Sequence, residues 1–412
     1  MSFLEHLPIL IAGAGIGGLS LAQALKKEGI PFKIYERDKG LEARSAGWGI
    51  TIHWAMSSLE RCLPPNLFKD LDSIQVDPQQ GLKDTGRFLF LDLETAEPRY
   101  VIPPSFRRRV SRLKLRKLLT TKIDVNWAKS IAGFKSTDNG VLISFTDGTE
   151  AEGSMLVAAD GSGSNIRQLL IEHDLGRLKR LPVNHLAVTR RLTEKQVSPL
   201  RDIDPLLFQG SHPDTGYYMW YSTLSTPDAN GSCDTDSPYY EAQLNMSWLV
   251  KGTEDDVPPT NAERLGKMKA MATAGTGFER ALREAVNDIP EGTEVVDIKL
   301  ADWPTVQWRG FDGRITLLGD AAHAMTMYRG EAANHAFTDA AKLKEQLKLW
   351  HRGKKTRQEA LADYELEMIE RGHHAVLLSR QACLDAHDIR NLSPDSPLVS
   401  RRTRVLTPAS KA

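Results

Sequence analysis

Short apolar runs flank a helical pattern at the start of the chain. Residues 7–12 (LPILIA) form an apolar run that stops at glycines, and apolar and small residues then recur at helical spacing over residues 16–27. Pro31 interrupts this pattern, and residues 32–35 are predicted to form a second buried strand. Strand, helix and strand in this order make one βαβ unit, so the glycines lie on a strand-to-helix turn.

Two kinds of pattern follow along the rest of the chain. Apolar runs at residues 155–159 and 314–318 are typical of parallel strands, and each is followed by aspartate or glycine. Between residues 181 and 250, apolar and polar residues alternate, which predicts a largely antiparallel sheet. Helices are predicted over residues 111–120, 264–286 and 338–386, and a hairpin strand over residues 141–145.

These patterns predict an α/β fold with interleaved parts. A Rossmann-type nucleotide-binding domain is expected to be built from two parts of the sequence, with a mainly antiparallel substrate domain between them. A C-terminal helical segment is expected to follow. The expected boundaries are 1–180 and 301–337 for the two parts of the nucleotide-binding domain, 181–300 for the substrate domain, 338–390 for the helices and 391–412 for a flexible basic tail.

The composition is that of an ordinary globular protein. The chain has 412 residues, of which 41% are apolar, so disordered, collagen-like and disulfide-scaffold proteins are excluded. Its 53 basic and 53 acidic side chains cancel, which gives no general attraction to nucleic acid or to an anionic membrane surface. A small molecule is therefore the expected partner.

The cysteines favour a reducing, cytoplasmic location. Cys62, Cys233 and Cys383 are too far apart to form a metal-ligand pair, and an odd number is not typical of a disulfide framework. No metal site is predicted. The first apolar run has no basic region before it, and no stretch approaches the ~20 apolar residues that a membrane span needs, so no membrane span is predicted.

The first glycines form a GxGxxG motif, made of Gly13, Gly15 and Gly18, with Glu36 at the end of the next predicted strand. Gly13 allows the tight turn, Gly15 lets a pyrophosphate approach the start of a helix, and Gly18 lets the helix pack closely on the strand. Glu36 can accept hydrogen bonds from the adenosine ribose. The alternative is a glycine-rich turn followed by a solvated glutamate.

Two later segments resemble cofactor-binding turns. The strand at residues 155–159 leads into Asp160, Gly161, Ser164 and Arg167, which together can hold ribose and phosphate groups. Taken alone, Asp160-Gly161 is equally typical of a helix N-cap turn, because an aspartate at that position accepts backbone N–H groups. The strand at residues 314–318 leads into Gly319-Asp320 and a long stretch of small residues.

In this order, the three segments resemble the signatures of class A flavoprotein monooxygenases, the FAD-dependent hydroxylases related to p-hydroxybenzoate and salicylate hydroxylases. The signatures are GxGxxG at residues 13–18, DGxxSxxR at residues 160–167 and GDAAH at residues 319–323. The resemblance extends over residues 7–386 and is weakest over residues 170–300. In detail the chain is similar to fungal secondary-metabolite monooxygenases.

The resemblance implies FAD as the cofactor and assigns residues to it. Glu36 is expected at the adenosine ribose, Arg112 at the pyrophosphate and ribityl region, and Asp320 at a ribityl hydroxyl. Asp160 is expected to contact FAD and to shape the binding of NAD(P)H. Gly49, together with Gly47, matches the family's small-residue stretch beside the isoalloxazine ring.

The family's segment after GDAAH places a helix N-terminus near the flavin, and here it departs at two positions. Met327 stands where the family has a proline, and Ala332 stands where it has a glycine. These changes predict a loop of different rigidity or a less close approach to the flavin. The backbone N–H of Ala333 is still expected to support negative charge on the reduced flavin.

The resemblance also implies a reaction. NAD(P)H, bound transiently, reduces FAD, O₂ forms a C4a-hydroperoxyflavin, and its distal oxygen hydroxylates or epoxidises an aromatic, indolic or polycyclic small molecule in secondary metabolism. One alternative is an FAD-dependent oxidase or reductase on the same fold without oxygen insertion. A flavin-bound interaction or redox-sensing protein is a second alternative.

Residues that act on the substrate are expected on the antiparallel sheet. The candidates are Arg190, Arg191, Tyr217, Tyr218, Trp220 and Trp248. Adjacent strand residues face opposite sides, so only one residue of each neighbouring pair can face the flavin. We predict that Arg190 stabilises a phenolate or oxyanion and that Tyr217 orients it. The alternative is a solvated arginine and a half-buried sheet tyrosine.

Overall fold

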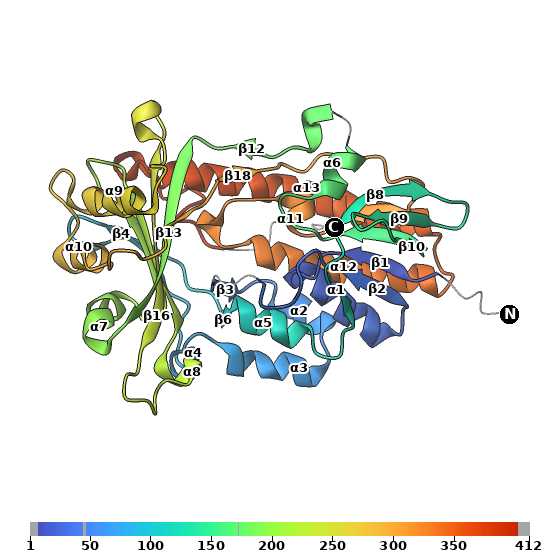
Figure 1. Cartoon of the computed structure of the whole chain (residues 1–412), viewed down its shortest axis with the longest axis horizontal. Coiled ribbons are helices and arrows are strands. Elements are labelled where there is room, and N and C mark those ends of the chain that lie inside the picture. The colour runs from blue at the N-terminus through green and yellow to red at the C-terminus, as the bar shows by residue number, and fades with distance from the viewer. Residues whose placement is uncertain (1–6, 44–46, 172, 403–412) are drawn as a thin grey trace.

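The computed structural model describes residues 7–43, 47–171 and 173–402. A five-stranded parallel sheet lies at one end of the molecule (Figure 1). Its strands, in spatial order, are β19 (Ile315–Leu317), β11 (Met155–Ala158), β1 (Ile9–Ala12), β2 (Phe32–Tyr35) and β7 (Val125–Asn126). Because β1 and β11 are buried along their whole length, both are continuous apolar runs, as parallel strands usually are.

Long helices pack beside this sheet. Helix α1 (Ile16–Glu28) follows β1, as predicted, and contacts α12 (Ala332–His351), which in turn packs against α13 (Arg357–Asp385). A small antiparallel sheet of β8 (Ile131–Ser136), β9 (Val141–Phe145) and β10 (Glu150–Gly153) lies against β1. The return of the chain into the first sheet through β19 confirms the predicted interleaving.

A seven-stranded sheet stands at the other end of the molecule (Figure 1). Its strands, in spatial order, are β17 (Val296–Asp297), β13 (Val183–Leu192), β16 (Tyr240–Leu249), β15 (Tyr218–Ser225), β14 (Leu207–Ser211), β4 (Phe88–Asp92) and β5 (Pro98–Ile102). All neighbours are antiparallel except β14 and β4, so the sheet is mainly antiparallel, as predicted. However, β4 and β5 come from within the segment 1–180 that was assigned to the nucleotide-binding domain, so that boundary was wrong.

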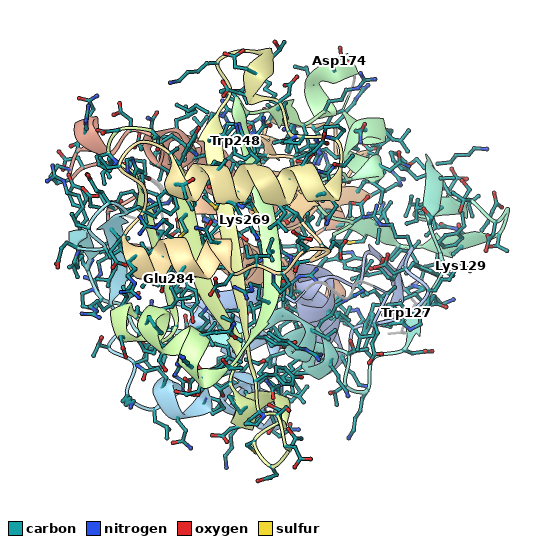
Figure 2. All side chains as sticks on the ribbon, turned by 60° about the vertical axis from the view of Figure 1, so that its left-hand side comes forward. Trp127, Lys129, Asp174, Trp248, Lys269 and Glu284 are labelled. Atoms are coloured by element: carbon teal, nitrogen blue, oxygen red, sulfur yellow. The ribbon has the colours of Figure 1, made fainter. Side chains whose placement is uncertain are left out.

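The two faces of this sheet have different surroundings. Its outer face packs against α7 (Glu194–Ile203), α9 (Asn261–Thr273) and α10 (Arg280–Asn287), and Figure 2 shows α9, with Lys269, and α10, with Glu284, lying across the strands. The single helix predicted over residues 264–286 is instead two helices. Gly275 and Gly277 lie between the two helices and have φ of 65° and 79°. A helix cannot continue through residues with such positive φ values.

The inner face of the sheet turns toward the parallel-sheet part. It meets β3 (Gly49–Ile52), β6 (Arg108–Ser111), η4 (Met327–Arg329) and the segment after α13. That segment contradicts the predicted flexible tail over residues 391–402. Leu398 and Arg402 are buried, and the Arg402 guanidinium donates to several backbone carbonyls, including that of Leu398 at 2.8 Å. Residues 403–412 of the predicted tail lie outside the described residues.

The remaining elements connect these parts. They are α2 (Met56–Cys62), α3 (Pro65–Lys69), η1 (Asp70–Ile74), α4 (Pro78–Gly81), α5 (Arg112–Leu119), α6 (Asn165–Leu170), η2 (His173–Gly176), β12 (Lys179–Arg180), α8 (Pro227–Asn230), η3 (Thr253–Asp255), β18 (Ala301–Asp302), α11 (Asp320–His323) and η5 (Ile389–Asn391). Within the described ranges, every helix is too short or too polar to cross a membrane.

A buried ionic cluster joins the third glycine turn to the C-terminal helices. Asp339 of α12 accepts the backbone N–H of Gly319 at 2.8 Å, lies 2.6 Å from His323 Nε2 and accepts from Arg371 Nη2 of α13 at 2.6 Å. All three side chains of the cluster are shielded from water. Burial acts to raise the pKa of Asp339, but the charges and hydrogen bonds of His323 and Arg371 outweigh it and hold this pKa below its usual range.

Replacing Asp339 by alanine is expected to lower the free energy of unfolding by about 3–5 kcal/mol, because Arg371 would lose a buried counter-charge. Urea denaturation followed by circular dichroism measures the change. Asp363, whose side chain is half exposed on α13, supplies the control Asp363→Asn, which we expect to change stability by less than about 0.5 kcal/mol. An equal loss in both variants would contradict a special role of the cluster.

Candidate functional site

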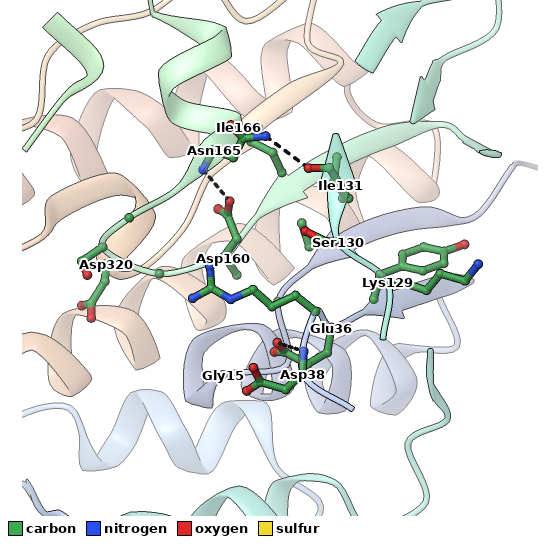
Figure 3. Close-up of a pocket in the computed structure, with 18 of the residues that line it drawn as sticks. Gly15, Glu36, Asp38, Lys129, Ser130, Ile131, Asp160, Asn165, Ile166 and Asp320 are labelled. Carbon is green, nitrogen blue, oxygen red and sulfur yellow. Dashed lines mark hydrogen bonds between the residues drawn. The ribbon is translucent and has the colours of Figure 1, made fainter. Parts of the chain in front are cut away.

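A groove of about 240 Å³ opens at the carboxyl ends of β1, β2 and β11 (Figure 3). It brings together six of the predicted cofactor-binding residues from distant parts of the chain. These are Gly13, Gly15, Glu36, Arg112, Asp160 and Asp320. The carboxyl ends of parallel strands are where ligands bind in open α/β sheets, because loops and helix N-termini converge there.

The three predicted glycines act in three ways. Gly13 has φ of 103°, and a Cβ there would lie 2.3 Å from the carbonyl oxygen of Ala159. A Cβ at Gly18 would lie 2.0 Å from the carbonyl oxygen of Gly13, so Gly18 allows close packing and does not line the groove. At Gly15 no described atom lies within 4 Å of the position of a Cβ, which leaves the start of α1 open to a ligand.

Glu36 lies at the end of β2, as predicted, and is held in place by backbone groups. Its carboxylate accepts the N–H of Ala14 at 2.8 Å and the N–H of Asp38 at 3.0 Å. Arg116 lies 3.6 Å from the same carboxylate and donates to the Ala14 carbonyl at 2.8 Å. We had not predicted Arg116, although it lies one helical turn after Arg112 on the same face of α5.

The segment after β11 caps a helix and leaves one oxygen free. Asp160 accepts the N–H of Asn165 at 3.0 Å, and Ser164 accepts the N–H of Arg167 at 2.9 Å, so both cap α6. The other oxygen of Asp160, Oδ1, is buried and has no hydrogen-bond partner in the described part of the chain. Burial raises the pKa of Asp160.

Arg167 is not positioned to bind a cofactor phosphate. Its guanidinium donates to the carbonyls of Gly176 at 2.8 Å and Ala321 at 3.1 Å, and it lies over the ring of Trp303. The expectation that this arginine holds ribose or phosphate groups was therefore wrong. It ties the second turn to the third because backbone carbonyls satisfy its planar donor groups.

The third turn places Asp320 in the groove. Asp320 begins α11 directly after Gly319, which has φ of 64°. Asp320 is exposed to solvent where it lines the groove. The carboxyl group can therefore serve as a hydrogen-bond partner for a ligand hydroxyl.

Ala333 lies in the first turn of α12, beside the strand that carries Gly49. The Asn334 side chain accepts the N–H of His53 at 2.9 Å and donates to the carbonyl of Thr51 at 3.0 Å, which joins the helix start to β3. Helix α12 begins at Ala332 even though the family's glycine and proline are missing. Ala333 and Gly49 lie outside the lining of the groove.

Gly49 makes room for an arginine that we had not predicted. A Cβ at Gly49 would lie 2.6 Å from Nη2 of Arg109, the residue opposite Thr51 on β6. Arg109 is only 4% exposed and bonds to the hydroxyl groups of Thr51 and Ser222. Its position in a run of three arginines gave no sequence signal for its burial.

The expected catalytic pair, Arg190 and Tyr217, lies on the outer face of the sheet, which packs against helices and not against the part of the fold that carries the groove. Arg190 donates to the carbonyls of Ala285 and Asp288, each at 2.9 Å, at the end of α10. Tyr217 packs in the apolar cluster under the same helices. The alternation of facing directions along the strand was correctly expected. Arg190 faces outward because the free carbonyls at a helix C-terminus attract a guanidinium.

Tyr218, the neighbour of Tyr217, lies on the inner face in a polar network, whereas Arg191 is exposed and lies 3.7 Å from the Glu241 carboxylate. Tyr218 donates to the Gln209 side chain at 2.9 Å, and its ring lies 4.9 Å from that of Tyr328. Ser247 connects the Tyr328 hydroxyl at 2.8 Å with His387 at 2.9 Å. Burial raises the pKa of Tyr218 well above its usual value, so its hydroxyl stays a donor.

Several buried polar atoms of this face have no partner among the described residues. They are Nε2 of Gln209, Oδ1 of Asn245 and both ring nitrogens of His185. Burial lowers the pKa of His185 to about 3, so the ring is neutral at physiological pH. Such atoms usually find a water molecule or a ligand, which makes the inner face the candidate substrate-binding surface. No cluster of three or more potential metal ligands occurs within the described ranges.

The groove fits the adenosine diphosphate half of an FAD molecule. The open approach to Gly15 at the start of α1 suits a diphosphate, because free N–H groups and the helix dipole attract anions. The unpartnered oxygen of Asp160 and the acidic side chain of Asp320 suit hydroxyl donors.

Comparisons with known proteins agree with this geometry. The family model described as "FAD binding domain" matches residues 279–379. FAD-dependent monooxygenase dbaB of Emericella nidulans is 52% identical over 341 residues, which cover 82% of this chain and 86% of that protein. FAD-dependent monooxygenase phnB of Penicillium herquei is 32% identical over 397 residues, covering 95% and 94% of the two chains.

A solved structure shows the same fold. The 2,6-dihydroxypyridine-3-hydroxylase of Arthrobacter nicotinovorans superposes with a TM-score of 0.74 at 19% identity, and the match covers 96% of each chain.

Replacing Gly15 by alanine is expected to weaken FAD binding about tenfold without unfolding the protein, because the added methyl group enters the groove and meets no protein atom. Flavin fluorescence titration measures the affinity, and thermal unfolding of the FAD-free protein measures the fold. Gly266, a similarly open position on α9, supplies the control Gly266→Ala, which should leave affinity unchanged. Unaltered affinity in Gly15→Ala would contradict the assignment of this groove.

Proposed function

The chain belongs to the FAD-dependent monooxygenases, and from this premise we propose that it uses NAD(P)H and O₂ to hydroxylate or epoxidise an aromatic, indolic or polycyclic small molecule. The observation that carries the proposal is the convergence of three distant turns on one groove, in a fold that also has a sheet face with unpartnered buried polar atoms. A cofactor site and a separate substrate surface are what a two-substrate oxygenation requires.

Bound FAD, reduced by NAD(P)H, supplies the activation of O₂. Around it, we assign Glu36 to the adenosine ribose, Gly15 and Arg112 to the pyrophosphate, and Asp320 to a ribityl hydroxyl. We also assign Asp160, whose Oδ1 has no partner among the described residues, to a contact with FAD that helps to shape NAD(P)H binding.

The start of α12 is assigned to the flavin ring. The N–H of Ala333 is one of the first-turn donors without a partner within a helix, and it supports negative charge on the reduced ring. Asn334 fixes this helix start against β3, the strand in which Gly49 lies. The two family departures, Met327 and Ala332, leave this arrangement intact.

The inner face of the seven-stranded sheet holds and orients the substrate. Tyr218 and Gln209 present a hydrogen-bonded pair, and Asn245 presents a free acceptor. The packed segment around Leu398 and the buried Tyr328 shield this face from water. Exclusion of water protects a reactive oxygenating species and strengthens each polar contact.

The biological setting is part of the proposal. The resemblance to fungal secondary-metabolite monooxygenases supports a role in secondary metabolism. The odd number of widely separated cysteines supports a cytoplasmic location.

Oxygen labelling tests the reaction. The FAD-loaded protein is mixed with NADPH or NADH, ¹⁸O₂ and a panel of phenols and indoles, and the products are analysed by mass spectrometry. We expect faster FAD reduction with one panel class and one ¹⁸O atom in the product for each NAD(P)H consumed. Hydrogen peroxide formed in equal amount to the NAD(P)H oxidised, with no labelled product, would favour the oxidase alternative.

Neighbouring tyrosines test the substrate face. Tyr218→Phe removes a hydroxyl on the inner face, and we expect the yield of product per NAD(P)H to fall about tenfold as a hydrogen bond is lost. Tyr217→Phe makes the same chemical change on the outer face and is the matched control. Product yield and hydrogen peroxide are measured together, and an equal effect of both substitutions would contradict the assignment of the faces.

A further inference from the structure

Arg109 carries a buried positive charge, and the groups that hydrogen-bond to it or stack on it among the described residues are neutral. Its Nη1 donates to the Thr51 hydroxyl at 2.7 Å, its Nη2 donates to the Ser222 hydroxyl, and its guanidinium lies 5.9 Å from the ring centre of Trp220. The third nitrogen, Nε, has no hydrogen-bond partner in the described ranges. A planar guanidinium with a free edge is suited to an oxygen anion.

The charge environment of Arg109 is unfavourable without a further anion. Burial, together with the positive charge of Arg107, lowers the pKa of Arg109 to about 9, and the more distant Asp204 opposes this shift. Arg107 itself is paired with Asp84 at 2.7 Å. Buried charges in proteins are normally paired, because a charge without a partner loses its hydration and gains nothing in return.

The position of Arg109 is the junction between the two parts of the fold. Its own strand, β6, pairs with β3, which carries Gly49 and Thr51. Ser222 and Trp220 belong to β15 and lie on the inner face of the seven-stranded sheet. The glycine at position 49 leaves the space that the guanidinium occupies.

The wall of this junction is aromatic. Trp220 meets the ring of Phe88 edge-on, with ring centres 5.7 Å apart. Such rings accept a flat apolar molecule, because aromatic groups prefer stacked or edge-to-face contacts. A cation beside an aromatic wall therefore suits a flat molecule that carries a negative oxygen.

We propose that Arg109 is a specificity-determining residue that binds an anionic oxygen of the substrate, a phenolate, enolate or carboxylate on an aromatic ring system lying against Trp220. This rests on the proposed function and names the charge of its substrate. The reduced flavin is the other possible source of an anion at this junction. The substrate is favoured because two of the three groups that contact Arg109 lie on the substrate-binding sheet.

Ligand binding to the oxidised, FAD-loaded protein tests the proposal without turnover. The probes are 1-hydroxy-2-naphthoate and 1-hydroxy-2-naphthamide, which have nearly the same shape but differ in charge. Changes in the flavin absorption spectrum give both dissociation constants. We expect the native protein to bind the anion at least about tenfold more tightly than the amide.

Arg109→Met should abolish this preference, and Arg109→Lys should restore part of it because the charge returns without the planar fork. Arg108→Met, on the adjacent position of β6, is the matched control, since Arg108 pairs with the exposed Asp72. Ser222→Ala, which keeps the charge, is a second variant and should weaken binding of the anion to a smaller extent. FAD content and thermal unfolding are measured for every variant.

An unchanged preference for the anion in FAD-loaded Arg109→Met would overturn the proposal. If the flavin reduction potential of that variant is also lower, Arg109 is assigned to the reduced flavin instead. Because the probes bind without reaction, this result is distinguishable from a failure of the oxygen-labelling experiment.

Discussion

The arrangement of the site depends on how closely the backbone of the first turn approaches the end of the neighbouring strand. Gly13 lies against the carbonyl of Ala159, and Gly18 lies against Gly13, at distances that no side chain would allow. This contact brings the start of α1 beside Asp160, and the pairing of β11 with β19 brings Asp320 to the same edge. Three turns far apart in sequence therefore form one binding groove because their glycines permit it.

Local patterns predicted the elements that local chemistry determines. The βαβ unit, the parallel strands and the residues of the groove follow from apolar runs and from glycine and acid at strand ends, which do not depend on distant contacts. The break between α9 and α10 was missed although Gly275 and Gly277 were visible, because the apolar spacing on either side of them was compatible with one helix. The location of β4 in the second sheet depends on pairing with β14, which no local pattern reveals.

The substrate face shows why site prediction was less successful there. Alternation established that Arg190 and Arg191, and likewise Tyr217 and Tyr218, face opposite sides, but it contains no information about which side meets the cofactor. That choice depends on α10, whose terminal carbonyls bind Arg190. The same limitation applies to Arg402, which was expected in a solvated tail. It is instead buried, and backbone carbonyls of its own segment and of Tyr328 and Arg329 accept its donors. From composition alone, basic residues are expected to be exposed to solvent. Only the folded chain shows which backbone carbonyls accept hydrogen bonds from them.

The buried arginines of this chain differ in the groups that accept their hydrogen bonds, and this difference bears on function. Arg167, Arg190 and Arg402 are also buried, but backbone carbonyls accept their donors, so their burial stabilises the packing of segments. Arg109 differs because hydroxyl groups and an aromatic ring are its neighbours, and its Nε has no partner in the part of the chain that the structure describes. A guanidinium kept in such surroundings lowers the stability of the empty protein and is compensated when an anion binds. Arg314 and Arg357 also have an Nε without a partner among the described residues, but their other donors reach backbone carbonyls. The hydroxyl and aromatic neighbours of Arg109, more than the unpartnered Nε, therefore support its assignment to a ligand.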